Sequence, residues 1–97
     1  MNNCVFVGRV TKTPQLTYTG EGTARCNFYV AVKDPQRNEP DYVPCVAWHS
    51  YAETLANVLH SGKLVSIESK FKSTNYTENG RPKVFYEFHV HHVQFLD

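Results

Sequence analysis

The chain has 97 residues, enough for one small domain with a modest hydrophobic core. Its formal net charge at pH 7 is only +1, so overall charge gives little support for nucleic-acid binding, and any basic surface must come from local clustering. The three cysteines are too widely spaced for a disulfide framework or a zinc site, and there is no secretory signal and no transmembrane stretch. We therefore expect one cytoplasmic domain, residues 1–97, with free thiols in a reducing compartment.

The beginning of the chain has the pattern of a β-strand. The run 5–10 is mostly apolar, and with the period of two that is typical of strands Val5 and Val7 point to one side and Phe6, Gly8 and Val10 to the other. Gly8 inside this run predicts a bulge or a sharp coil, as a corner of a small closed barrel requires. Pro14 predicts a turn, after which a second extended piece begins at Leu16.

Similar alternation recurs along the rest of the chain. It predicts further strands over 25–33, 42–48, 64–71 and 84–96, with a polar, proline-containing loop at 34–40. Asn79-Gly80 is a strong signal for a hairpin turn before the last strand. Pro44 lacks an amide donor, so we expect a free strand edge there.

A helix is predicted between the third and fourth strands. Ser50 followed by Glu53 has the spacing of a capping box, and Tyr51 and Leu55 recur at helical spacing. Gly62 is placed to close the helix in a left-handed conformation. Three strands, one helix and two strands is the order of an OB-fold, an all-β, five-stranded Greek-key barrel with one helix between strands three and four.

Short motifs along the chain, in order and at similar spacing, resemble those of the bacterial single-stranded DNA-binding proteins. They are Val5-Phe6-Val7-Gly8-Arg9-Val10-Thr11-Lys12, Val46-Ala47-Trp48, Gly62-Lys63-Leu64-Val65, Thr74-Asn75-Tyr76 and Val93-Gln94-Phe95-Leu96. The resemblance covers nearly the whole chain. It implies the same OB-fold and a non-enzymatic protein that binds single-stranded DNA with little sequence preference. It also implies assembly as a homotetramer, with a dimer as the second choice.

Proteins that hold single strands without reading sequence combine aromatic side chains, which stack on bases, with cations that follow the phosphates. By resemblance, Tyr42, Trp48 and Tyr76 align with base-stacking positions of the family; without it, Trp48 is as well explained as a core residue. The expected phosphate contacts are the basic residues near these aromatics, namely Arg9, Lys12, Lys33, Arg37, Lys70, Lys72 and Arg81, with Lys83 beside them. Lys70 and Lys72, two residues apart, should share one strand face.

The chain departs from the family pattern at several positions. The loop 33–41 is shorter than usual, and Gln36 stands near the place of another stacking aromatic. Thr17 and Thr74 occupy positions where relatives often have arginine. The sequence stops at Asp97, so the resemblance implies a short form without the acidic C-terminal tail that recruits partner enzymes.

Two other functional classes are a protein-binding OB-fold and an enzyme. A primosomal accessory protein of the PriB type, also a short OB-fold, would act mainly through protein contacts, and Trp48 and Tyr76 favour DNA binding over it. An enzyme has little support, since there is no nucleophile–base pair and no phosphate-binding glycine loop. His89 and His91 have the spacing of metal ligands, but only Glu87 stands near them, so we expect no metal and no cofactor.

Overall fold

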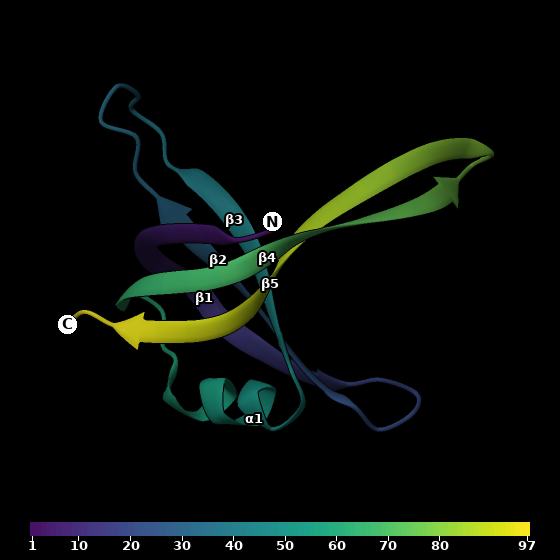
Figure 1. The fold of residues 1–97 in the computed structure, drawn as a ribbon, viewed down its shortest axis with the longest axis horizontal. Coiled ribbons are helices and arrows are strands. Elements are labelled where there is room, and N and C mark those ends of the chain that lie inside the picture. Colours follow the sequence, from purple (N-terminus) through teal and green to yellow (C-terminus); the bar gives the residue numbers. More distant parts are fainter.

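The computed structural model describes residues 1–97 as five strands and one helix (Figure 1). They are β1 (Cys4–Tyr18), β2 (Ala24–Val32), β3 (Asp41–Trp48), α1 (His49–Val58), β4 (Leu64–Glu78) and β5 (Arg81–Phe95). The strands close into a barrel in the order β1-β2-β3-β5-β4, with β3 and β5 parallel and the other pairs antiparallel. This confirms the predicted OB-fold with one helix between the third and fourth strands. The single helix is too short to cross a membrane.

β1 turns a corner of the barrel where it changes partner. Its first part, up to Arg9, pairs with β4, and from Arg9 onwards it pairs with β2. Gly8 lies at this corner, where a Cβ atom would come within 2.7 Å of the Val30 side chain and closer still to the carbonyl of Ala31. The corner expected at Gly8 is therefore confirmed, and only glycine fits there.

The irregularity in β1 lies after Gly8. The register with β2 shifts between Thr11 and Gln15, and Lys12 has a φ of 61°. The shift is a bulge, in which β1 has more residues than the β2 segment opposite. Pairing with β2 resumes at Gln15, so β1 runs unbroken past Pro14. The predicted turn at Pro14 is thus wrong.

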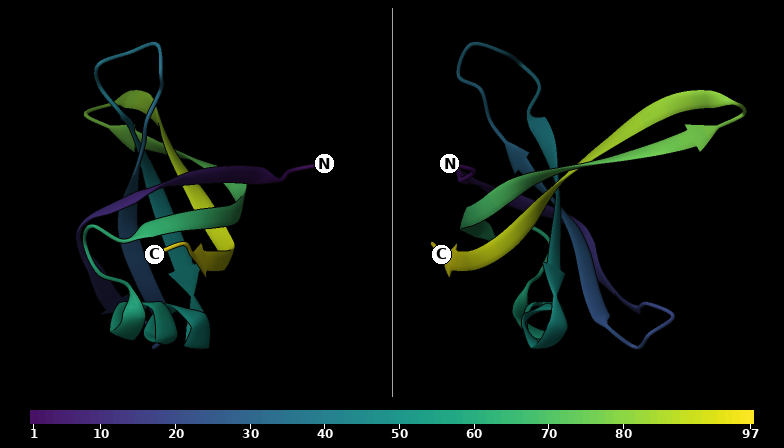
Figure 2. Two further views of the ribbon diagram at one scale, coloured as in Figure 1. Left: turned by 90° about the vertical axis from the view of Figure 1, so that its left-hand side faces the viewer. Right: turned by 45° about the vertical axis from the view of Figure 1, so that its right-hand side comes forward.

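α1 lies across one end of the barrel (Figure 2). Its Leu55, and Leu59 directly after the helix, close the core at this end. The predicted capping box is wrong: β3 runs directly into the helix, whose N-cap is Trp48 with no side-chain hydrogen bond. Glu53 instead accepts a hydrogen bond from the Tyr18 hydroxyl of β1 at 2.9 Å. The helix also ends at Val58, before the predicted Gly62.

Contrary to the prediction, Gly62 does not close the helix but lies in the turn that follows it. It adopts the left-handed conformation, with a φ of 93°, in the turn between α1 and β4. Its amide donates to the carbonyl of Val10 at 2.7 Å, which ties this turn to β1.

β4 and β5 are longer than their apolar patterns predicted. The turn at Asn79-Gly80 is confirmed, with φ values of 53° and 76°. Residues 70–86 are all exposed, and they form a hairpin that projects beyond the barrel (Figure 1). The projecting part of the hairpin packs on no core, so an apolar pattern could not predict it. It is strand because its residues pair in a ladder from Lys70–His89 to Glu78–Arg81.

Candidate nucleic-acid interface

The outer surface of β2 and β3 carries aromatic side chains. Along β2, Phe28 and Val30 point into the core, so Tyr29 between them points outward. On β3, Tyr42 and Trp48 share the outer face, because they are separated by an even number of residues. The barrel therefore presents three aromatic side chains on two neighbouring strands.

Tyr42 belongs to a hollow that the sequence did not reveal. Tyr42, Tyr29, Lys12 and Thr11 line an open concavity of about 530 Å³. The bulge in β1 brings Lys12 to this place. A cation beside two exposed aromatic rings suits a base and its phosphate. Tyr29 was not among the predicted site residues. Because it alternates with the apolar Phe28 and Val30 in the run 26–32, the sequence could have placed it on the outer face.

Trp48 lies at the other end of β3. It is six residue steps from Tyr42 along the strand, which corresponds to about 20 Å. The side chain is half-buried and lines a hollow of about 610 Å³ with His49 and the β1–β2 turn. The Arg25 guanidinium carbon lies over the ring, 4.9 Å from its centroid. Trp48 is thus neither a core residue nor a fully exposed platform.

The β4–β5 hairpin has two different faces, because residues opposite each other in the ladder point to the same side. One face carries most of the aromatic and basic candidates, namely Lys70, Lys72, Tyr76, Arg81, Lys83 and Phe85. Two carboxylates share this face, Glu78 opposite Arg81 and Glu87 opposite Lys72. The structure therefore brings together five residues that the sequence had predicted, and it confirms that Lys70 and Lys72 share a face. Phe85 was missed, although counting back from the Asn79-Gly80 turn would have placed it opposite Thr74.

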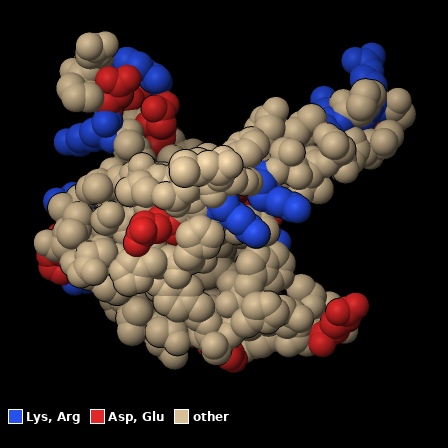
Figure 3. All heavy atoms as spheres, viewed as in Figure 1, with Lys and Arg blue, Asp and Glu red and all other residues tan.

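The other face of the hairpin continues the aromatic packing of the barrel. The rings of Phe71 and Tyr86 are stacked with centroids 5.4 Å apart, and Phe71 also meets Phe88, which meets Phe6. In Figure 3, basic side chains lie at the tip of the hairpin and again where it leaves the barrel. Positive charge therefore marks both ends of the projecting hairpin.

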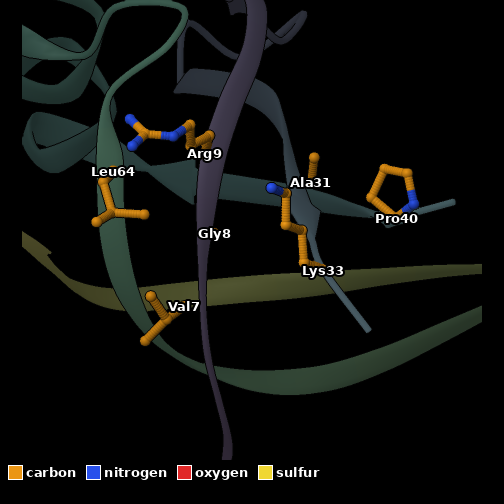
Figure 4. A pocket seen from close by; sticks show the side chains of 7 residues that line it. All are labelled: Val7, Gly8, Arg9, Ala31, Lys33, Pro40 and Leu64. Atoms are coloured by element: carbon orange, nitrogen blue, oxygen red, sulfur yellow. The ribbon is translucent and has the colours of Figure 1, made fainter. Parts of the chain in front are cut away.

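Arg9 and Lys33 line a second hollow, of about 410 Å³, together with Gly8 and Pro40. Their side chains lie on either side of β1 at Gly8 (Figure 4). Arg9 is engaged already: it donates to the carbonyl of Gly62 at 2.9 Å and pairs with Asp97 at 3.2 Å. The backbone amide of Leu64, and then Arg9, lower the pKa of the Asp97 carboxyl.

Arg37 stands apart from the other candidates. It lies in the β2–β3 loop and pairs with Asp41 at 3.2 Å. This loop mixes acidic and basic side chains (Figure 3). Part of the charge of Arg37 is therefore neutralised within the loop.

The histidines of β5 differ in environment. His89 is mostly buried and contacts Glu87 at 3.0 Å, whereas His91 is exposed. The ladder pairs His92 with Glu68 and Val90 with Ser69, so His91 is an extra residue that breaks the alternation. No group of three His, Cys, Asp or Glu side chains has an arrangement suited to a metal ion.

Comparison with known proteins places the chain in a family. The sequence profile of the Single-strand binding protein family matches residues 1–96. The chain is 39% identical to Single-stranded DNA-binding protein 3 of Listeria innocua, in an alignment that covers all of this chain and 64% of the relative. It is 38% identical to the Single-stranded DNA-binding protein of Halalkalibacterium halodurans, with 100% and 61% covered. The chain thus spans less than two thirds of the length of these relatives. It belongs to the Single-strand binding protein family.

Proposed function

We propose that this protein binds single-stranded DNA with little sequence preference and has no catalytic activity. The observation that carries the proposal is the hairpin face on which Tyr76 and Phe85 lie among Lys70, Lys72, Arg81 and Lys83. Single-stranded DNA needs this combination, since bases stack on aromatic rings and cations neutralise the phosphates between them. The relatives, all named single-stranded DNA-binding proteins, support the same function.

The bound DNA would pass from the hairpin to the outer surface of the barrel. The outer surface of β3 adjoins β5, because Val46 pairs with His89. Tyr42 with Lys12, and Trp48 at the far end of β3, then offer further stacking positions. Arg9 and Lys33 would contact phosphate groups at the edge of this surface. Arg37 would have to release Asp41 before it could bind a phosphate group. Stacking is tolerant of sequence because every base has a π-face.

The PriB-type alternative is not favoured. The family profile and the named relatives all point to single-stranded DNA-binding proteins. The hairpin face also matches nucleic acid better than a protein partner, because Tyr76 and Phe85 lie on it together with four basic side chains and are exposed.

We also propose self-association as a homotetramer in the cytoplasm, with a dimer second. Val5 and Val7 on the outer face of β1 are 59% and 49% exposed, and their burial in a partner would be favourable. Leu55 and Leu59 are buried in the core and take no part in such a contact. The three free cysteines are consistent with a reducing compartment. Light scattering at micromolar concentration tests the subunit number, and a monomer mass would contradict it.

Fluorescence of Trp48, the single tryptophan, tests DNA binding directly. We expect oligo(dT) to quench its emission, and the affinity to fall with salt by about 0.7 logarithmic units per phosphate neutralised and per tenfold change in salt. Trp48→Ala removes the signal, so its affinity is measured by anisotropy of labelled oligo(dT). Absence of binding at low salt would refute the proposal. Equal affinity for duplex DNA would refute its specificity for single strands.

A further inference from the structure

Four side chains on the outer surface of the barrel, one of which is Trp48, form a closed ring of contacts. The indole Nε1–H of Trp48 donates to Nδ1 of His89 at 3.3 Å, and Nε2 of His89 lies 3.0 Å from Oε1 of Glu87. The other carboxylate oxygen of Glu87 accepts from Arg25 at 2.7 Å. Arg25 closes the ring with its guanidinium over the indole, and its Nε–H donates to Asn27 at 2.8 Å.

The donors and acceptors of this ring specify one form of His89. An indole N–H can only donate, so Nδ1 of His89 has to be an unprotonated acceptor. Nε2 then carries the proton and donates it to Glu87. Glu87 is only 7% exposed, so its carboxylate depends on its two donors, His89 and Arg25. Neutral His89 with its proton on Nε2 therefore satisfies every bond of the ring.

We propose that His89 is a positioning residue for DNA binding, which holds Trp48 in the orientation that accepts a base only while the imidazole is neutral. This inference rests on the proposed function, because it takes Trp48 to be a stacking residue. A second proton on His89 would place an N–H on Nδ1, facing the indole N–H. The two donors repel each other, so the indole loses its anchor and turns.

The surroundings of His89 are charged on three strands. Glu87 lies on the same strand, and Arg25 reaches His89 through Glu87 from β2. On β4, Lys70 stands directly opposite His89, and Lys72 stands opposite Glu87. His91, farther along β5, is exposed, and the neighbour on β3 is the apolar Val46. Histidines in general change charge between about pH 8 and pH 5, so acidification tests the anchor.

The first measurement uses the protein without DNA. We expect the emission of Trp48, the single tryptophan, to change on acidification, when a second proton on His89 breaks the anchor. The substitution His89→Gln offers an amide oxygen to the indole and an amide donor to Glu87 but does not titrate, so it should abolish this transition. His91→Gln, an exposed change on the same strand, should retain it. A transition that persists unchanged in His89→Gln would overturn the proposal.

The second measurement is the affinity for oligo(dT). At about pH 8, His89→Ala should bind about three- to tenfold more weakly than the parent protein, as expected for a lost hydrogen bond, while His89→Gln restores most of the affinity. At an acidic pH at which the Trp48 emission has changed, the parent protein should bind more weakly than His89→Gln. Stronger binding by the parent at that pH would mean that His89 acts as a cation for phosphate, and would overturn the proposal.

The two measurements separate the inference from the function on which it rests. If the parent protein fails to bind oligo(dT) at any pH, the proposed function fails, and the emission of the free protein still decides whether His89 anchors Trp48. If DNA binds but His89→Ala, folded by circular dichroism, matches the parent protein at both pH values, the function stands and the positioning role is refuted.

Discussion

Tyr29 on β2 and Tyr42 on β3 are diagonal neighbours on the outside of the barrel, since Tyr42 pairs with Ala31 and Tyr29 with Pro44. Both rings face one hollow with Lys12. The exposed fractions are 44% for Tyr29 and 62% for Tyr42, so both rings are available to a ligand.

We predict that Tyr29 contributes to DNA binding as Tyr42 does. Replacing either residue by Ala should weaken binding to oligo(dT) by about 1–3 kcal/mol, because one stacked base is lost. Anisotropy titrations at constant salt measure the effect. Tyr18→Ala is the control, since Tyr18 is 56% exposed but bonded to Glu53 on α1. If Tyr29→Ala binds like the parent protein, the hollow does not hold a base.

The two faces of the hairpin give a matched pair of variants. Phe85 and Val84 are neighbours with exposed fractions of 46% and 48%, but they point to opposite faces. Phe85→Ala should lower the affinity by about 1–3 kcal/mol, because Phe85 shares the basic face with Tyr76. Val84→Ala should leave it nearly unchanged. Equal losses in the same anisotropy assay would show that binding does not distinguish the faces.

Lys70 and Lys72 should account for part of the salt dependence. Replacing both by Ala should make the slope of log affinity against log salt shallower by about 1.4, if each neutralises one phosphate. Fluorescence titrations of Trp48 at several salt concentrations give the slope. Lys63→Ala, in the turn before β4, is the control and should leave the slope as it is. An unchanged slope in the double variant would contradict the phosphate contacts.

Gly8→Ala should destabilise the fold by about 1–3 kcal/mol, since overpacking forces the backbone to shift. The new Cβ would press on the carbonyl of Ala31 and the side chain of Val30 at the barrel corner. Urea unfolding followed by circular dichroism measures the loss. At Gly20 a Cβ would meet no atom within 4 Å, so Gly20→Ala is the matched control. Equal stability of the two variants would show that the corner can relax.

The cysteines should differ in reactivity in the folded protein. Burial raises the pKa of the Cys45 thiol to about 12 and also raises the pKa of Cys26, whereas Cys4 is half-buried. At pH 8 only about one part in ten thousand of Cys45 is thiolate, the form that reacts. A thiol reagent should therefore label Cys4 alone, and all three cysteines after unfolding. A fast signal that survives Cys4→Ser would contradict this assignment.

Local patterns determined much of this protein. Period-two alternation set which residues of each strand point inward, and the Asn79-Gly80 turn fixed the register of the hairpin. These features depend on neighbours along the chain, so the sequence alone predicts them. The same patterns placed Lys70 and Lys72 on one face, and family resemblance added Tyr42, Trp48 and Tyr76 as candidates.

Tertiary structure decided what surrounds those candidates. The parallel contact of β3 with β5 joins Trp48 to His89, which is 41 residues away, and no local pattern predicts such a pairing. The start of α1 was decided in the same way, because Glu53 bonds to Tyr18 across the fold in place of a cap at Ser50. Local signals give a preference of only about 1 kcal/mol, and contacts between distant strands are strong enough to override it.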